Sequence, residues 1–384
     1  MKRASKVLAI LMAFALVMGF AAMSASAESQ VTTTFNKKLG VPSNAQVPNV
    51  EFVFTLTPGT AVQGDEDTIS VNAGIGSPTV EHAVFSNGMT TVAGDATKGE
   101  DANKVYATDQ VTMDFSGITF PGPGIYRYIL TEQPTTDYYG SITNDTNSTR
   151  IVDVLVAKNG DNLEITGYAM RNPSDNVDDD PFYPAVNIGD DPYNYADQDP
   201  SVKTVEFKNE YETVDLEFSK KITGNQADTT KKFTFTLAIE DAIPGDYEIQ
   251  VVNGDDVIVD GSGVTNNKIT VASDGTYTGT FALTDGDVVK VIGLNKGYQY
   301  TLTENAEDYT SADGVDNDGT DNDFTDATAS TAGVTTNVKT GFTNTREGII
   351  PTGVIVTVAP FMIGLLLFGA VMMFMISRRR RAAY

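Results

Sequence analysis

Cysteine is absent from the 384-residue sequence, and so is tryptophan. A chain without cysteine forms neither disulfides nor thiolate sites, so any covalent crosslink must use other residues. Histidine occurs only at position 82. A multi-histidine metal site is therefore excluded, and a Ser-His-Asp triad would need His82 itself, which we interpret as a surface strand or loop residue. These absences argue against the commonest hydrolytic and metal-dependent enzymes.

Positive charge is scarce, because 26 Lys and Arg stand against 51 Asp and Glu and the net charge is -25. Phosphate binding needs clustered basic residues, so we expect no nucleic-acid partner. The acidic stretch Asp316 to Asp323 superficially resembles a calcium loop. With Gly319 at the turn position, however, the first ligand would be Gly314 and the closing residue Thr325 rather than Glu. We expect a solvated loop, no metal and no cofactor.

The N-terminus has the order of a secretory signal peptide. Basic residues at Lys2, Arg3 and Lys6 precede an apolar run from Val7 to Met23, and a small-residue segment ends at Ala27. This order predicts a signal peptide over residues 1–27, with cleavage after Ala27. A buried N-terminal helix is the alternative, but the run shows no alternation with polar residues.

The C-terminus carries a second apolar run, Val354 to Ile376, which is long enough to cross a bilayer. Four arginines follow it and should stay cytoplasmic by the positive-inside rule. Immediately before the run stand Ile349, Ile350, Pro351, Thr352 and Gly353. Residues 347–384 thus resemble a sortase sorting signal, which is cut between the Thr and the Gly, although the leucine-first form is commoner. A plain transmembrane anchor is the alternative.

The region between these ends alternates Val, Thr, Phe and Tyr with polar residues and contains no convincing amphipathic helix. This pattern predicts an all-β fold of Ig-like sandwiches. A repeat divides it: Phe35-Asn36-Lys37-Lys38-Leu39 returns as Phe218-Ser219-Lys220-Lys221-Ile222. We predict two tandem domains, residues 28–212 and 213–346, joined by a link too short to swing freely.

Each domain sends one lysine inward. Residues two apart in a strand share a face, so Lys37 lies with Phe35 and Leu39, and Lys220 with its own apolar neighbours. The adjacent Lys38 and Lys221 fall on the opposite, solvent-facing side. The same parity places a glutamate and an asparagine inward in each domain: Glu132 and Asn209 in the first, Glu304 and Asn344 in the second.

One chemistry uses all three residue types. Apolar surroundings lower the pKa of Lys and raise that of Glu, which favours a neutral amine beside a protonated acid. The amine then attacks the Asn side-chain carbonyl while the Glu hydrogen-bonds the Asn oxygen and shuttles the proton, giving an amide and ammonia. The alternative is a buried Lys-Glu ion pair with a hydrogen-bonded Asn. The matched triple in both repeats favours the isopeptide bond.

The motifs F-x-K-K-[LI], Y-x-L-T-E and F-[KT]-N, present twice and followed by IIPTG, resemble the streptococcal T-antigen type of major pilin. The resemblance covers essentially the whole chain. It implies Lys-Asn bonds between Lys37 and Asn209 and between Lys220 and Asn344, assisted by Glu132 and Glu304. It also implies that a lysine near the end of the first domain receives the sorting-signal Thr of the next subunit. Lys203 is the nearest match, with Lys208 or another loop lysine as alternatives.

The resemblance predicts a structural pilin of a Gram-positive cell wall, secreted, transiently held in the membrane and then polymerised. The implied partners are a sortase, identical subunits, minor or tip pilins and peptidoglycan. A surface adhesin attached singly to the wall is the alternative. An enzyme acting on an external substrate has little support, because no nucleophile-base pair stands out.

We predict that replacing Lys203 abolishes the covalent polymer and leaves wall attachment of the monomer intact, since only polymerisation needs an acceptor amine. Blots of wall extracts should lose the ladder that resists boiling detergent, and Lys208→Ala serves as the control. Mass spectrometry of native polymer should show Thr352 joined to Lys203. Finding it on another lysine would exclude Lys203 alone, whereas finding it only on peptidoglycan would exclude polymerisation.

Overall fold

The computed structural model describes residues 31–64, 70–135, 137–172, 206–252, 263–316, 330–348 and 373. The predicted signal peptide, Lys203, the pentapeptide at 349–353 and, except for Met373, the predicted membrane span lie outside these residues. Within the described ranges, no helix is both long and apolar enough to cross a membrane.

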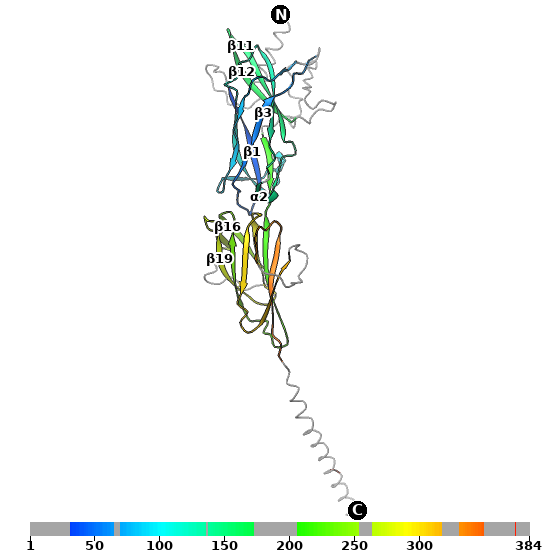
Figure 1. Ribbon diagram of the computed structural model, residues 1–384, viewed down its shortest axis with the longest axis vertical. Coiled ribbons are helices and arrows are strands. Elements are labelled where there is room, and N and C mark those ends of the chain that lie inside the picture. Colours follow the sequence, from blue (N-terminus) through cyan, green and yellow to red (C-terminus); the bar gives the residue numbers. More distant parts are fainter. Residues whose placement is uncertain are drawn as a thin grey trace, which may run out of the picture.

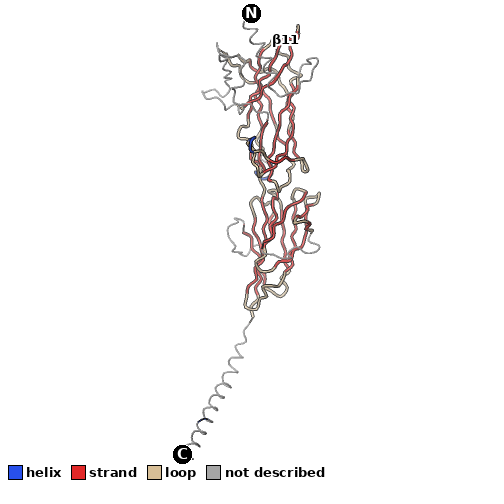
Figure 2. The backbone as a smooth tube through the Cα atoms, turned by 180° about the vertical axis from the view of Figure 1, so that it is seen from behind, coloured by secondary structure: helices blue, strands red, loops and turns tan. Residues whose placement is uncertain are grey.

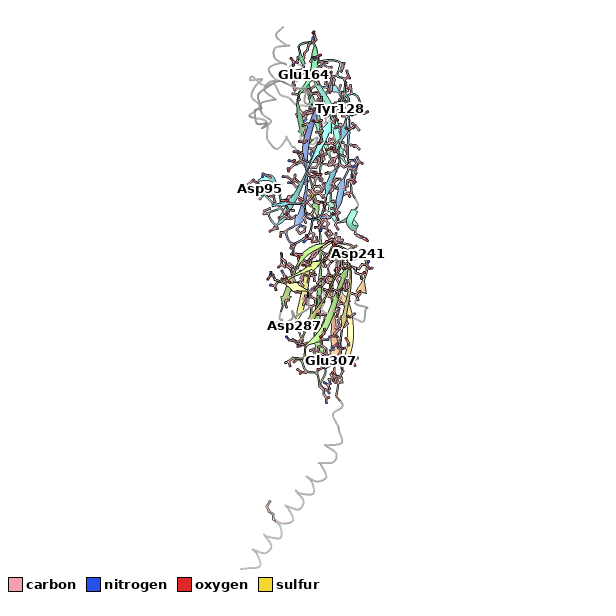
Figure 3. All side chains as sticks on the ribbon, turned by 90° about the vertical axis from the view of Figure 1, so that its left-hand side faces the viewer. Asp95, Tyr128, Glu164, Asp241, Asp287 and Glu307 are labelled. Carbon is pink, nitrogen blue, oxygen red and sulfur yellow. The ribbon has the colours of Figure 1, made fainter. Side chains whose placement is uncertain are left out.

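Two β-sandwich units are stacked end to end along the long axis (Figure 1). Strands dominate both units, and the short helix α2 (Asp137–Gly140) lies near their junction (Figure 2). A single 3-10 turn, η1 (Ala96–Lys98), accompanies it in the described chain. Side chains fill both units (Figure 3), and the buried apolar residues form two distinct clusters, one in each unit. The all-β Ig-like architecture predicted from the alternation is confirmed.

The first unit packs two main sheets around one of these clusters. One sheet has the order β10 (Ile142–Thr143), β13 (Glu206–Tyr211), β1 (Thr32–Pro42), β8 (Lys104–Asp114) and β5 (Thr79–Val80), with β7 (Thr91–Ala93) also on β8. The other has the order β12 (Asn162–Arg171), β11 (Thr149–Asn159), β9 (Gly124–Glu132) and β3 (Phe54–Pro58), with β4 (Asn72–Ala73) also on β9. A small pair, β2 (Val50–Phe52) and β6 (Ala83–Phe85), completes the unit.

The second unit is built in the same way. Its larger sheet has the order β17 (Val264–Thr265), β18 (Lys268–Val271), β16 (Gly245–Val252), β20 (Val288–Leu294), β14 (Val214–Thr223), β24 (Val338–Thr345) and β22 (Thr310–Asp316). The facing sheet has the order β19 (Tyr277–Leu283), β15 (Phe233–Glu240), β21 (Gln299–Glu304) and β23 (Ser330–Thr331).

In each unit the first strand pairs in parallel with the last one. β1 lies between antiparallel β8 and parallel β13, and β14 lies between antiparallel β20 and parallel β24. A parallel pair cannot be joined by a hairpin and needs a longer connection. Here that connection contains all the other strands of the unit. The chain thus enters and leaves each unit on adjacent strands.

The junction between the units is short and makes direct contacts. β13 ends at Tyr211 and β14 begins at Val214. The first unit donates hydrogen bonds from Gln46 Nε2 to the Asp246 carbonyl (2.8 Å) and from Asn87 Nδ2 to the Pro244 carbonyl (2.6 Å). Such a connection holds one unit against the other.

Gly293 lets the two units approach closely. Its φ is +81°, and a Cβ there would lie 2.7 Å from the Asn44 carbonyl oxygen of the first unit. Gly286 has a similar φ of +84°, yet nothing lies within 4 Å of its Cβ position. The two glycines therefore share the backbone conformation and differ in the contact.

We expect Gly286→Ala to lose about 1–2 kcal/mol of stability from left-handed backbone strain alone. Gly293→Ala should lose more and also push the Asn44 loop away, so that the junction bends. Thermal unfolding and small-angle scattering of both variants test this. Identical melting and scattering curves would show that the Gly293 contact does not constrain the junction.

Candidate functional sites: two buried lysine, glutamate and asparagine clusters

The first cluster joins three side chains from three strands. Lys37 comes from β1, Glu132 from the end of β9 and Asn209 from β13. Lys37 Nζ lies 2.8 Å from Glu132 Oε1 and 2.9 Å from Oε2, and Asn209 Nδ2 donates to Oε1 at 2.6 Å. The exposed fractions are 0% for Lys37, 2% for Glu132 and 0% for Asn209, so the cluster is closed to water.

The second cluster repeats this arrangement. Lys220 from β14 places Nζ 2.5 Å from Oε1 of Glu304, which ends β21. This contact is a buried ion pair. Asn344 Nδ2 from β24 donates to the same oxygen at 3.1 Å, and Ser311 Oγ donates to Oε2 at 3.1 Å. The Lys220 and Glu304 side chains are 0% and 1% exposed.

Strand register explains why both clusters form. Lys37 pairs with Phe207 across β1 and β13, so Asn209, two residues on, projects to the same face one step along the strand. In the second unit Lys220 pairs with Phe342, with Asn344 again two residues on. The glutamates also correspond, because Glu132 pairs with Phe54 in β3 and Glu304 with Phe235 in β15.

Burial makes both lysines unusually acidic. Desolvation lowers the pKa of Lys37 from 10.5 to about 8, against the opposing effect of Glu132. Desolvation likewise lowers the pKa of Lys220 to about 8, opposed by Glu304. Phenyl rings surround the amines: Lys37 Nζ lies 4.4 Å from the centroid of Phe52, and Lys220 Nζ 4.5 Å from that of Phe233. Both amines therefore reach the neutral, nucleophilic form more readily than a surface lysine does.

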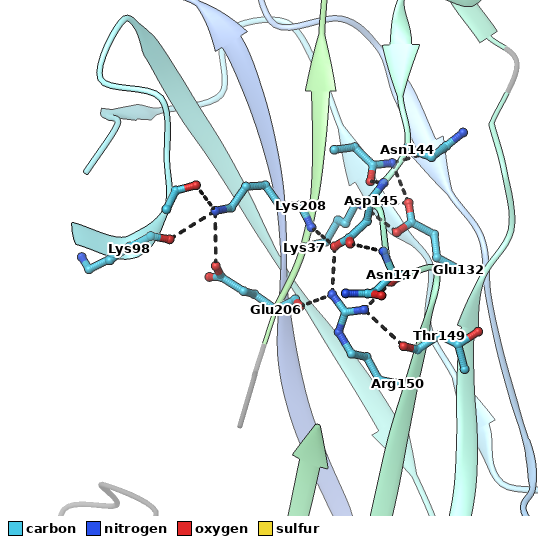
Figure 4. Close-up of polar contacts among 12 residues, drawn as sticks. Lys37, Lys98, Glu132, Asn144, Asp145, Asn147, Thr149, Arg150, Glu206 and Lys208 are labelled. Atoms are coloured by element: carbon cyan, nitrogen blue, oxygen red, sulfur yellow. Dashed lines mark hydrogen bonds and ion pairs between the residues drawn. The ribbon is translucent and has the colours of Figure 1, made fainter. Parts of the chain in front are cut away.

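The sequence placed Glu on the Asn oxygen, and the structure differs in both clusters, because each Glu accepts from the Asn amide nitrogen. Glu132 accepts from the amide nitrogen of Asn209, whereas Oδ1 accepts from the backbone N–H of Asp145 at 2.8 Å. Asp145 and the neighbouring Arg150 form a polar network beside Lys37 and Glu132 (Figure 4). Sequence reasoning missed this network. The run N-D-T-N-S-T-R at 144–150 is rich in turn-forming residues and could have indicated a polar turn here.

Two further charged groups are buried or partly buried, and for Lys38 this differs from the prediction. Lys38 was expected to face solvent, yet its side chain is only 14% exposed and pairs with Glu100 at 2.6 Å and Glu206 at 2.8 Å. Arg127 is fully buried and forms a two-pronged pair with Asp153 at 2.8 and 2.9 Å. His82 lies on the surface, as predicted, beside Glu51. In the described residues, no group of three or more His, Asp or Glu side chains could hold a metal.

Fold and clusters together define a two-domain β-sandwich protein with a reactive-type Lys, Glu and Asn set buried in each domain. Residues 33–212 match the model of the Spy0128-like isopeptide containing domain, and residues 214–346 match a domain of unknown function, DUF7601. The boundary between these matches falls in the link between β13 and β14.

Curated relatives extend the comparison. The chain is homologous to a pilin of Streptococcus pyogenes serotype M1, with 26% identity over 386 residues that cover 95% of this chain and 97% of the relative. It also matches the pilus tip adhesin Cpa of Streptococcus pyogenes, with 32% identity over 139 residues. That match covers 36% of this chain and 18% of the adhesin.

Solved structures share the fold. The major pilin from Streptococcus pyogenes gives a TM-score of 0.56 at 24% identity and covers 83% of this chain and 99% of its own. The T3.2 major pilin of the same species gives 0.55 at 20% identity, with coverage of 82% and 99%. The resemblance to major pilins expected from the motifs is confirmed.

Lys37 gives the uncrosslinked first domain a distinctive pH dependence. In an Asn209→Ala variant the amine has no acyl acceptor and stays free. Unfolded Lys37 keeps its proton up to a pKa of 10.5, but folded Lys37 only to about 8. Between these values the unfolded state binds more protons, so the free energy of unfolding should rise with pH, by about 3 kcal/mol in total.

Urea unfolding at a series of pH values measures this rise. The double variant Lys37→Met, Asn209→Ala is the control, and equal pH dependence in both would contradict the assignment.

Proposed function

We propose that the chain is the shaft subunit of a sortase-assembled pilus, stabilised by one intramolecular isopeptide bond in each domain. The homology to a pilin over 95% of the chain carries the proposal. The Lys, Glu and Asn clusters in the same register of both domains support its chemical part.

The bond-forming step is self-directed. Neutral Lys37 Nζ attacks Asn209 Cγ, Glu132 takes a proton from the attacking nitrogen, and the same carboxyl delivers a proton to Nδ2. The Nζ–Cγ bond forms, the Cγ–Nδ2 bond breaks and ammonia leaves. Glu132 Oε1 touches both nitrogens, at 2.8 and 2.6 Å, which suits this transfer. Lys220, Glu304 and Asn344 perform the same step in the second domain.

The crosslink also resolves the electrostatics of the core. A buried amine and carboxylate lose several kcal/mol of hydration each unless they pair well. Amide formation removes the ammonium from the core. The product is therefore better suited to an apolar interior than the ion pair from which it arises.

Polymerisation is the intermolecular counterpart. We propose that a sortase cleaves between Thr352 and Gly353 and transfers the Thr352 carboxyl to Lys203 of an identical subunit. The polymer stands on the Gram-positive cell wall, attached to peptidoglycan, with minor or tip pilins as further partners. The local match to a pilus tip adhesin agrees with a shared domain type among the parts of a pilus.

A singly anchored adhesin is the second candidate, favoured by that same match. The match is confined to 139 residues and to 18% of the adhesin, however, whereas the pilin aligns from end to end. The extent of alignment therefore favours the shaft subunit.

We expect the mature protein to weigh less than its sequence by two ammonia molecules, because both bonds form spontaneously. Asn209→Ala and Asn344→Ala should each restore one of the two losses, and Lys221→Ala, on the opposite strand face, should restore none. Intact-mass measurement with peptide mapping checks all four proteins. A folded wild-type sample at full sequence mass would leave the buried ion pair as the correct interpretation.

A further inference from the structure

Both polar atoms of the Asn209 side chain form hydrogen bonds. Nδ2 donates to Glu132 at 2.6 Å and to Asn144 Oδ1 at 3.4 Å, and Oδ1 accepts from the Asp145 backbone N–H at 2.8 Å. A backbone N–H can only donate, so this contact fixes which end of the amide is the oxygen. The leaving nitrogen thus faces the acid, and the carbonyl oxygen faces a main-chain donor.

Several hydrogen bonds hold the turn that contains Asp145. Its carboxylate accepts from the backbone N–H groups of Asn147 and Lys208, both at 2.8 Å, and from Arg150 Nη2 at 2.9 Å. Lys208 directly precedes Asn209 in β13. The donor and the carbonyl that it contacts are therefore tied to the same strand.

Arg150 contacts the turn through several hydrogen bonds (Figure 4). The residue is only 4% exposed, and its guanidinium donates to Asp145, to the Glu206 carbonyl at 3.1 Å and to the Thr149 carbonyl at 3.2 Å, with a further contact to the Asn147 carbonyl. It also stacks 4.1 Å from the ring centroid of Phe207, the residue that pairs with Lys37. A guanidinium with these contacts leaves the turn little freedom to shift.

We infer that the Asp145 backbone N–H is the oxyanion donor for bond formation in the first domain, and that Arg150 is a positioning residue that holds it there. The inference rests on the isopeptide chemistry proposed above. As Lys37 Nζ adds to Asn209 Cγ, the carbonyl double bond opens and negative charge moves onto Oδ1, where the N–H already points. When the tetrahedral centre collapses and ammonia leaves, Oδ1 becomes the oxygen of the new amide and keeps the same hydrogen bond.

A donor fixed before reaction is effective because it needs no reorganisation as charge develops, and one such donor typically contributes about 100-fold to 1000-fold in rate. The second domain offers a comparison within the same molecule. Asn344 Oδ1 has no hydrogen-bond partner among the described residues. Changes at Asp145 or Arg150 should therefore alter the first bond and leave the second unaffected.

The electrostatic effect of Asp145 has the opposite sign and can be separated, whereas the Arg150 charge lowers the pKa of Lys37, so its loss slows the reaction in the same direction as a displaced donor. The donor assignment is therefore decided by the Asp145 variants. Desolvation dominates the lowered pKa of Lys37, and the Asp145 carboxylate acts against it. Removing that charge alone would favour the neutral amine and speed the reaction. Slower bond formation in Asp145→Ala thus reports a displaced donor rather than a lost charge.

The test follows both bonds in one chain over time. Mature protein, residues 28–352, is collected denatured at full sequence mass, refolded, quenched at intervals and assigned by intact mass and peptide mapping. Asp145→Ala and Arg150→Met should slow the first bond about tenfold, and Arg150→Lys should restore part of the rate. Replacing the residue 145 amide by an ester, which deletes the N–H and keeps the side chain, should slow it about a hundredfold. Thr146→Ala, exposed on the same turn, is the matched control.

The outcomes distinguish a failure of the isopeptide chemistry from a failure of the donor assignment. Refolded wild type at full sequence mass would refute the isopeptide chemistry itself. Two bonds in wild type, with the first forming at an unchanged rate in the ester and in Asp145→Ala, would refute only the donor assignment. Equal slowing of both bonds would indicate a general folding defect and would also overturn it. Should Asp145→Ala fail to fold, the ester decides, because it retains every side-chain contact of the turn.

Discussion

A lysine amine without water is the constraint on which both domains depend. Lys37 and Lys220 project from the first strand of a sandwich into aromatic side chains, where an ammonium ion loses its hydration. Each amine forms an ion pair with one carboxylate, and one carboxamide lies two residues beyond its cross-strand partner. Because these groups come from three strands, the sandwich must be correctly closed before the cluster exists. Cluster formation thus reports complete folding of the domain.

Parallel pairing of the first and last strands determines how a domain would carry tension. Tension along a shaft enters a domain through one of these strands and leaves through the other, and hydrogen bonds alone would be loaded together in shear. The proposed covalent link between Lys37 and Asn209 would transfer tension directly between the two strands and bypass the rest of the sandwich. By analogy with a disulfide that closes a loop of this length, such a link would also stabilise the fold by about 5 kcal/mol through the unfolded chain. A cysteine-free chain would obtain crosslinks in this way without any redox chemistry.

The two domains have the same strand register, but different residues surround their Lys, Glu and Asn clusters. In the first, a fastened turn contacts the amide oxygen and Arg150 covers one side. In the second, Ser311 holds the free carboxylate oxygen of Glu304. Register is set by the strands, which the repeat preserves. The turns that join the strands are less constrained, so the surroundings of the same chemistry can diverge between the copies.

The sequence by itself determined the strand alternation, the repeat and the inward face of Lys37, Glu132 and Asn209, because side-chain direction in a strand follows from parity. It could not determine what covers the outward face. Lys38 and Arg127 are on that face and are nevertheless enclosed, by Glu100 and Glu206 in one case and by Asp153 in the other. Nor could it reveal the Asp145 donor, since a main-chain N–H is common to every residue except proline and leaves no trace in the sequence. That contact joins residues 64 positions apart, and only the folded turn brings its N–H to the Asn209 oxygen.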